Sequence, residues 1–333
     1  MAEILATDTR EKFDAAVARA AALLRAGEVV AVPTETVYGL AANALNPDAV
    51  RKIFEIKGRP AHNPVIVHVA SRELAAQCVS DWNDAAEKLA KAFWPGPLTL
   101  VLPKSSAIPD AVTGGGHTVG VRWPGHPFIQ AVIRECQFPL AAPSANPAGR
   151  LSPTTAEHVE KFFGDKVPLI VDGGAAQVGI ESTVMDVSVS PARLLRPGII
   201  HGESLIAVLG AIGGAGESGK HLKSPGMLAR HYSPQARLAV CSWSNDTELG
   251  AHVTALQSER GRCHVLAHDR IPDPRGFGRV SLIPHDPEAY ARALYAELHK
   301  CDELGAQLII VEAVPGTAEW DAIADRLRRA EAR

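Results

Sequence analysis

The chain has 333 residues, with 46% hydrophobic and 21% charged residues and a formal net charge of −3. This length suits about two domains, and the composition is typical of a soluble globular protein able to bury sizeable cores. The weak negative charge does not favour binding of nucleic acid by overall charge, so any anion site must come from local clusters of Lys and Arg.

In chain order, the first part of the chain predicts a helix at 8–27, a strand at 28–33, a helix at 46–58, a strand at 64–69, a helix at 81–93, strands at 98–102 and 117–122, a helix near 127–136, and strands at 139–142, 168–172, 182–187 and 193–196. Asp8 and Glu11 can cap the first helix, and Pro47 lies in the first turn of the second. Mixed strands and helices predict an α/β fold with one twisted mixed sheet and flanking helices.

A second α/β pattern follows a glycine-rich segment at 210–223, whose composition is typical of a linker. Strands are predicted at 237–241, 262–267, 279–283 and 307–312, and helices at 246–259, 287–303 and 317–330. We therefore expect a first domain at 1–209, a linker at 210–236 and a smaller, Rossmann-like α/β domain at 237–333.

The five cysteines include no CxxC pair, and their odd number favours reduced thiols in a reducing compartment. The first residues lack the apolar region of a signal peptide, and no apolar run approaches the ~20 residues of a membrane helix. We expect a cytoplasmic protein with no membrane association.

Residues 214–221 fit the GxxxxGK pattern of a phosphate-binding loop, but His221 stands where Ser or Thr would hold Mg²⁺. No clear strand precedes the segment, so a solvated linker is the better interpretation. The patterns for zinc, haem and the GxSxG nucleophile are absent from the sequence.

Lys57-Gly-Arg59 places two cations at the end of a predicted helix, where they can straddle a polyphosphate. The alternative is ordinary capping of a helix C-terminus by a cation, which these three residues alone favour. Arg122, at the end of a predicted strand, can hold a carboxylate or form a surface salt bridge. His68, taken alone, is best interpreted as a core histidine with satisfied hydrogen bonds.

Ser144-Ala-Asn146 ends another strand at a turn, where both polar side chains can bond the local backbone or donate to phosphate or ribose. Polar or cationic residues also occur at Arg150, in Glu181-Ser182-Thr183 and at Arg196. They gather where strands become loops, which is where α/β sheets place their ligands. Lys, Arg, Ser, Thr and Asn suit nucleotidyl transfer, in which a protein mainly positions reactants and stabilises phosphate charge.

The ordered motifs resemble those of the Sua5/YrdC/YciO family, in its long, two-domain form, over nearly the whole chain. These motifs are PTETVYGL at 33–40, KGR at 57–59, NPVIVHV at 63–69, SAN at 144–146, and SPGM with RHY within 224–232. The resemblance implies a YrdC-like catalytic domain, a linker that acts as a lid and a family-specific C-terminal domain. It also implies synthesis of threonylcarbamoyl-AMP and pyrophosphate from L-threonine, bicarbonate or CO₂, and ATP with Mg²⁺.

The resemblance also assigns site residues. The threonine pocket would comprise Thr36, His68, Arg122 and Ser182. The ATP site would comprise Lys57, Arg59, Asn63, Thr118, Ser144, Asn146, Arg150, Arg196 and Tyr232, with Lys57 and Arg59 catalytic and no metal ligand from protein side chains. The family linker often has Lys-Tyr after SPGM, where this chain has Leu228-Ala229, a difference that concerns lid packing.

The product would pass to the complex that transfers the threonylcarbamoyl group to adenosine 37 of tRNA, with direct contact to tRNA possible on this fold. Two alternatives remain open at this stage. One is a module that binds double-stranded RNA or tRNA, which the net charge mildly disfavours. The other is a different carbamoyl-transfer protein on the same fold, although such proteins carry zinc-finger cysteines or acylphosphatase segments that this chain lacks.

Overall fold

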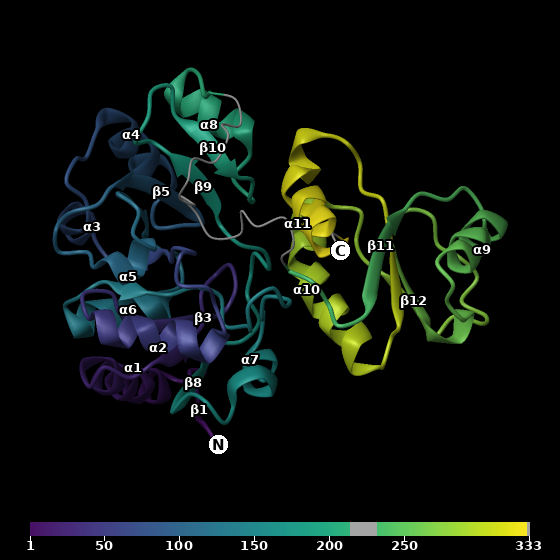
Figure 1. Ribbon diagram of the computed structural model, residues 1–333, viewed down its shortest axis with the longest axis horizontal. Helices are drawn as coiled ribbons and strands as arrows, with labels where there is room; N and C mark the ends of the chain where they lie inside the picture. The colour runs from purple at the N-terminus through teal and green to yellow at the C-terminus, as the bar shows by residue number, and fades with distance from the viewer. Residues whose placement is uncertain (214–231, 332–333) are drawn as a thin grey trace. The chain divides into compact units, whose positions relative to one another are not determined.

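The computed structural model describes residues 1–213 and 232–331. The chain divides into two compact units (Figure 1). The first comprises Met1–Ala148 with residues 152–213, and the second comprises Gly149–Leu151 with residues 232–331. The phosphate-loop pattern, the SPGM motif and His231 of the RHY motif lie outside the described residues. The predicted domain boundaries stay predictions.

The first unit is built on a ten-stranded mixed sheet in the order β1-β8-β2-β3-β7-β4-β6-β5-β9-β10. The strands are β1 (Glu3–Ala6), β2 (Val30–Val32), β3 (Gly39–Asn43), β4 (Val67–His68), β5 (Leu98–Pro103), β6 (Thr118–Arg122), β7 (Leu140–Ala141), β8 (Leu169–Asp172), β9 (Thr183–Asp186) and β10 (Arg193–Arg196). The helices are α1 (Arg10–Arg25), α2 (Pro47–Lys57), α3 (Arg72–Cys78), α4 (Asp84–Phe93), α5 (Asp110–Thr113), α6 (Pro127–Cys136), α7 (Ala156–Phe163) and α8 (Gly202–Leu209). The predicted α/β class with one mixed sheet is confirmed.

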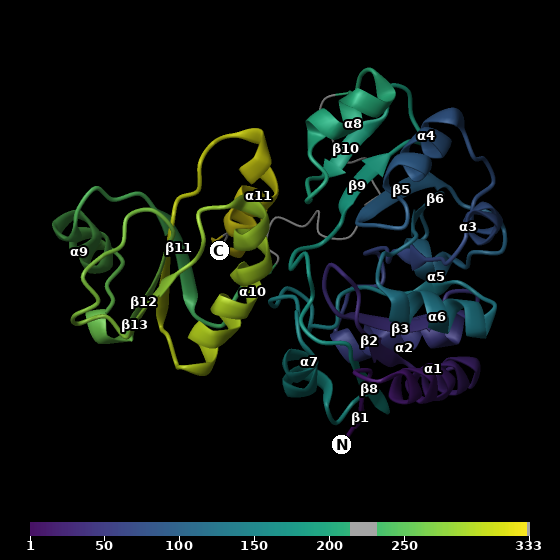
Figure 2. The ribbon, with the colours of Figure 1, turned by 180° about the vertical axis from the view of Figure 1, so that it is seen from behind.

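Apolar cores form on both faces of this sheet. Along β2, Val30 and Val32 face the core that includes α1 and α6, while Ala31 faces the core that includes α2, α4 and α7. Figures 1 and 2 show α1 lying beside α6. Burial on both faces explains why the strands read as continuous apolar runs rather than as alternating patterns.

Capping residues fix the helix that carries the KGR motif. The Asn46 side chain accepts from the backbone N–H groups of the first turn, Pro47 occupies that turn, and Gly58 ends the helix at φ 59°. Lys57 is therefore the last helical residue, as predicted. At α1 the predicted cap was wrong: Thr9, not Asp8, accepts from the Lys12 N–H, because Asp8 pairs with the Lys12 ammonium group instead.

Other boundaries also differ from the prediction. The strand predicted at 64–69 pairs only at Val67–His68, and the helix predicted at 81–93 begins at Asp84. The prediction missed six short elements, β1, β3, α3, α5, α7 and α8. Most of them are shorter than the window in which hydrophobic periodicity can be recognised.

The second unit contains a parallel sheet in the order β11-β14-β12-β13. Its elements are β11 (Arg237–Cys241), α9 (Asp246–Ala255), a 3₁₀ turn (Arg260–Arg262), β12 (Cys263–Ala267), β13 (Arg279–Leu282), α10 (Pro287–Glu303), β14 (Leu308–Glu312), a 3₁₀ turn (Ala318–Trp320) and α11 (Asp321–Glu331). Figure 2 shows α9 on one face of this sheet and α10 and α11 on the other. This pattern confirms the predicted smaller α/β domain. No described helix is long and apolar enough to cross a membrane.

Candidate active site

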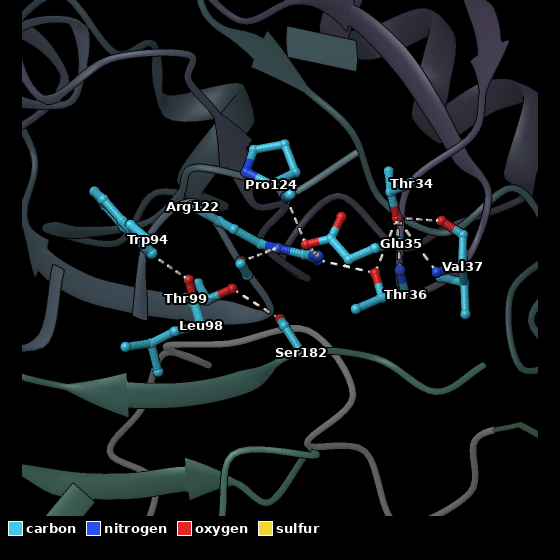
Figure 3. Close-up of polar contacts among 12 residues, drawn as sticks. Thr34, Glu35, Thr36, Val37, Trp94, Leu98, Thr99, Arg122, Pro124 and Ser182 are labelled. Carbon is cyan, nitrogen blue, oxygen red and sulfur yellow. Dashed lines mark hydrogen bonds and ion pairs between the residues drawn. The ribbon is translucent and has the colours of Figure 1, made fainter. Parts of the chain in front are cut away.

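The segment after β2 forms a buried polar turn. Thr34 Oγ1 donates to the Val37 carbonyl at 2.6 Å and accepts from the Thr36 and Val37 N–H groups at 3.2 and 3.3 Å. The Thr34 and Thr36 hydroxyls are 2.9 Å apart. A threonine side chain that bonds the backbone just after it stabilises a tight turn. This turn holds Glu35 and Thr36 beside the sheet (Figure 3).

Arg122, the last residue of β6, is held by three partners. Its Nη1 donates to Thr36 Oγ1 at 2.9 Å, its Nε donates to the Gly96 carbonyl at 3.2 Å, and its Nη2 lies 2.7 Å from Glu35 Oε1 (Figure 3). The Arg122 side chain is only 4% exposed. Arg122 therefore forms a buried ion pair rather than a surface salt bridge, which resolves one alternative left open by the sequence.

Glu35 is ionised despite its burial. Burial alone would raise the pKa of Glu35, but the Arg122 guanidinium and the Gly125 N–H, which donates to Oε1 at 2.7 Å, bring this pKa below its ordinary value. The second oxygen, Oε2, is buried and has no hydrogen-bond partner among the described residues. The carboxylate therefore keeps unused acceptor capacity.

His68 lies next to Arg122 because β4 and β6 are parallel and pair these two residues in register. Burial, aided by the positive charge of Arg122, lowers the pKa of His68 to about 3, so its ring is neutral at physiological pH. His68 Nδ1 is buried without a hydrogen-bond partner among the described residues. The interpretation of His68 as a fully satisfied core histidine is therefore wrong.

Ser182, which precedes β9, is tied to two neighbours. Its hydroxyl lies 2.8 Å from Thr99 Oγ1, and Arg196 donates from Nη2 to this hydroxyl at 3.1 Å and from Nε to the Ser182 carbonyl at 3.0 Å. The structure thus brings together two residues that the sequence assigned to different substrates. Gly120 pairs with Val101 and leaves room beside Thr99, because a Cβ at residue 120 would lie 3.2 Å from Thr99 Cγ2.

The KGR and SAN motifs are joined through a lysine. Lys57 Nζ donates to the carbonyls of Ser144 and Asn146, at 2.5 Å each. Lys57 is only 3% exposed, and burial, aided by the positive charge of Arg59, lowers its pKa well below the ordinary value. The interpretation of this lysine as routine helix capping is wrong, because its ammonium group bonds a turn distant in the sequence.

Arg59 and Asn63 form a second buried contact near this lysine. Arg59 donates to the carbonyls of Asn63 and Pro64, at 3.1 and 2.7 Å. The Asn63 side-chain oxygen is buried and has no partner among the described residues. Gly114, at φ 60°, lets the neighbouring loop approach this segment, because a Cβ there would lie 2.6 Å from the His62 carbonyl oxygen.

The contacts described above do not include three predicted ATP-site residues. Thr118 begins β6, four residues before Arg122 and thus about 13 Å away along the strand. Arg150 belongs to the second unit, where it forms a β-bridge with Ser233. Tyr232 is 1% exposed within that unit, with its ring 6.0 Å from Tyr295 and 5.4 Å from the Arg326 guanidinium. The ligand roles of these residues stay predictions.

Two residues of this site, Glu35 and Thr99, had no role predicted from the sequence. Glu35 is the single acid within the motifs at 33–40, 57–59, 63–69 and 144–146, and that was the available signal. Thr99 gave no signal, because a threonine inside an apolar strand is ordinary.

Taken together, the site offers two kinds of environment. Around Arg122, charges are paired and unused polar atoms remain on Glu35 and His68. Around Lys57 and Arg59, main-chain carbonyls orient both basic side chains. The first environment suits a small polar molecule and the second suits a polyanion.

Comparisons with known proteins identify the family of the chain. The family model Sua5_yciO_yrdC, described as "Telomere recombination", matches residues 22–198, and the model described as "Threonylcarbamoyl-AMP synthase, C-terminal domain" matches residues 200–332. Threonylcarbamoyl-AMP synthase of Bacillus subtilis is 42% identical over 97% of this chain and 95% of the relative. The corresponding protein of Pyrococcus abyssi is 41% identical over 93% of this chain and 92% of the relative.

Solved structures give the same result. Sua5 of P. abyssi complexed with L-threonine superposes with a TM-score of 0.89, at 39% identity, over 99% of this chain and 97% of the other. YciO of Escherichia coli, at 20% identity and a TM-score of 0.53, covers 60% of this chain and shows a shared fold alone.

Proposed function

The chain belongs to the Sua5/YciO/YrdC family, and we propose that its first unit joins L-threonine, bicarbonate or CO₂, and ATP at the residues around Arg122 and Lys57. The protein is a threonylcarbamoyl-AMP synthase, an enzyme of the nucleotidyltransferase type. The observation that carries the assignment of roles is the direct bond between Arg122 and Thr36, which builds one buried polar group from motifs distant in the sequence.

L-Threonine binds in this proposal at Arg122, Thr36, Ser182 and His68. Arg122 donates to protein partners from Nε and Nη1, whereas Nη2 is paired with Glu35 by charge and has no hydrogen-bond partner among the described residues, so N–H groups remain for a substrate carboxylate. The neutral ring of His68 adds an uncharged polar atom to the same face of the sheet.

ATP binds in this proposal at the KGR and SAN motifs, with Asn63, Thr118, Arg150, Arg196 and Tyr232 completing the site. Lys57 shapes the SAN turn through its two carbonyl contacts and adds positive charge when protonated, while Arg59 supplies a permanent charge. The threonine ammonium group first loses a proton to solvent, and the neutral amine attacks CO₂ and releases a second proton. The resulting carbamate oxygen attacks the α-phosphorus as pyrophosphate leaves. Lys57 and Arg59 stabilise the negative charge that develops on the phosphates.

Mg²⁺ enters in this proposal with ATP. The described residues contain no group of three or more His, Cys, Asp or Glu side chains that could hold a metal ion. The donors around the KGR and SAN motifs are cations, hydroxyls and amides, which fit an ion held chiefly by the phosphates and by water. When bound, Mg²⁺ offsets triphosphate charge.

The product contains an activated carbamoyl group, and we propose that it passes to the complex that modifies adenosine 37 of ANN-decoding tRNAs. The reaction would take place in the cytoplasm, where ATP and tRNA are present. Contact with tRNA during this transfer is a further part of the proposal.

A mass-spectrometric assay tests the reaction. The purified chain is incubated with ATP, Mg²⁺, bicarbonate and L-threonine beside Arg122→Ala, Lys57→Ala and a control, Asp186→Asn. Asp186 is a buried carboxylate at the opposite end of β9 from Ser182. We expect threonylcarbamoyl-AMP from the wild type and the control, and at least about tenfold less from the two site variants. No product from a wild type that binds RNA would favour the RNA-binding alternative.

A further inference from the structure

The Glu35–Arg122 pair places one negative and one positive charge in the same buried group. The carboxylate and guanidinium are 2.7 Å apart, and their side chains are 11% and 4% exposed. An ion pair so deeply buried is costly to desolvate and is weak evidence for a purely stabilising role. Its presence at the proposed threonine site therefore calls for a functional explanation.

Among the described residues, the titratable groups that face Glu35 are two neutral histidines and Arg122, so the Glu35–Arg122 pair carries the charge of this group of residues. His68 and His126 both interact electrostatically with Glu35, from β4 and from the segment before α6. Burial lowers the pKa of both rings, so both are neutral at physiological pH. Arg122, Glu35 and these two histidines then have a net charge of zero.

Glu35 Oε2 is an independent sign of a ligand. It is a buried oxygen of an ionised carboxylate without a hydrogen-bond partner among the described residues. Buried anionic oxygens are normally satisfied, because an unpaired one costs free energy. A cationic N–H donor on the ligand would supply the missing partner.

From these observations we propose that Glu35 makes the pocket selective for an amino-acid zwitterion, with the negative charge of Glu35 recognising the ligand ammonium while Arg122 recognises its carboxylate. This inference rests on the proposed function of the pocket as the threonine site. A site built only for a carboxylate would need an uncompensated cation, and that cation would repel an ammonium group bound beside it. The Glu35–Arg122 pair avoids both the uncompensated cation and the repulsion of the ammonium group, because the Glu35 carboxylate faces the ligand ammonium and the Arg122 guanidinium faces the ligand carboxylate.

The alternative role for Glu35 is structural, through the hydrogen bond that it accepts from Gly125. Glu35→Gln separates the two roles, because the amide oxygen can still accept from Gly125 while the negative charge is lost. Asp186→Asn provides the same chemical change at a buried carboxylate outside the site, where the carboxylate accepts from Ser188.

The test is calorimetric binding of two ligands to the full chain: L-threonine and 2,3-dihydroxybutanoate of matching stereochemistry, in which a hydroxyl replaces the ammonium group. We expect Glu35→Gln to weaken threonine binding by at least about tenfold and to leave the hydroxy acid within about threefold of the wild type. Asp186→Asn should change neither. Equal loss for both ligands in Glu35→Gln would overturn the proposal and leave Glu35 with a structural role.

A second measurement needs no variant. As the pH rises through the pKa of the threonine ammonium group, the wild-type affinity for threonine should fall, because the ligand loses its positive charge. The affinity for the hydroxy acid should stay constant over the same pH range. Parallel pH profiles for the two ligands would overturn the proposal. If the wild type makes no threonylcarbamoyl-AMP, the proposed function fails, whereas product formation with parallel profiles removes only the role of Glu35.

Discussion

Removal of the Arg122 charge should destabilise the fold more than removal of both members of its ion pair. Arg122→Met keeps the length of the side chain but leaves the buried Glu35 carboxylate without its counter-charge and removes the donors to Thr36 and Gly96. Loss of one partner of a buried pair costs about 3–5 kcal/mol, whereas loss of both costs much less. We therefore expect a cost of about 4 kcal/mol for Arg122→Met and about 2 kcal/mol for Arg122→Met with Glu35→Gln.

The free-energy cost of Arg122→Met should depend on pH in a direction set by the pKa of Glu35. In the wild type the pKa of Glu35 is lowered, so the contribution of the ionised pair is fully present above the ordinary value of 4.5 and is lost as pH falls through the lowered one. In Arg122→Met, burial acts without the guanidinium and raises the Glu35 pKa above the ordinary value. The penalty of Arg122→Met should therefore be larger at about pH 7.5 than at about pH 5.

Urea denaturation of the full chain at both pH values measures these free energies of unfolding for the wild type, the two single variants and the double variant. Additive costs, or a penalty for Arg122→Met that grows as the pH falls, would refute the argument that the pair is an energetically coupled unit. The Asp186→Asn variant again serves as the control, because its carboxylate is buried elsewhere.

Three other predictions concern the nucleotide side and the neutral histidine. Lys57→Met should lower ATP affinity by roughly tenfold, because the SAN turn loses both ammonium contacts. Calorimetry measures this affinity, and an unchanged value would contradict the prediction. Gly114→Ala should lower the free energy of unfolding by about 1–3 kcal/mol, because φ at this residue is 60° and the new Cβ would meet the His62 carbonyl. Urea denaturation measures this change, and equal stability would rule out the close contact. NMR should find the His68 ring neutral at about pH 5, because burial lowers its pKa to about 3. The contribution of this neutral ring to stability is therefore fully present above the unfolded pKa of about 6.5 and declines as pH falls towards about 3. A His68 titration near pH 6.5 would contradict the burial argument.

The parts of the fold that were predicted well have strong local signals. Helix α2 was located to within one residue at each end, because Asn46, Pro47 and Gly58 each act on the backbone next to them. Helices α3 and α7 were missed although Ser71 and Thr155 cap them, because each helix is too short to show a clear apolar period. β3 was missed because the sequence Gly-Leu-Ala-Ala-Asn has little strand propensity and pairs through its position in the sheet.

The site was predictable in its membership but not in its pairings. A cation at the end of a strand indicated that Arg122 could hold a carboxylate, and the resemblance placed Thr36 in the same pocket. The partner that Arg122 holds in this structure is Glu35, on a turn distant in the sequence. Such pairing depends on the tertiary fold, because β3, β7 and β4 separate β2 from β6 in the sheet, and the turn after β2 must reach across them to place Glu35 beside Arg122.

The charge arrangement of the site follows from the different needs of its two substrates. A zwitterion has no net charge, so a pocket with a compensated pair can bind both of its ends without leaving a buried charge alone. A triphosphate has a large net negative charge, so the positive charge of Arg59 and of protonated Lys57 attracts it. Lys57 and Arg59 are oriented by carbonyl dipoles, whereas Arg122 is balanced by a carboxylate. Glu35→Gln should accordingly leave ATP affinity near the wild-type value while it weakens threonine binding, and a comparable loss of both would show that the two charge environments are not separate.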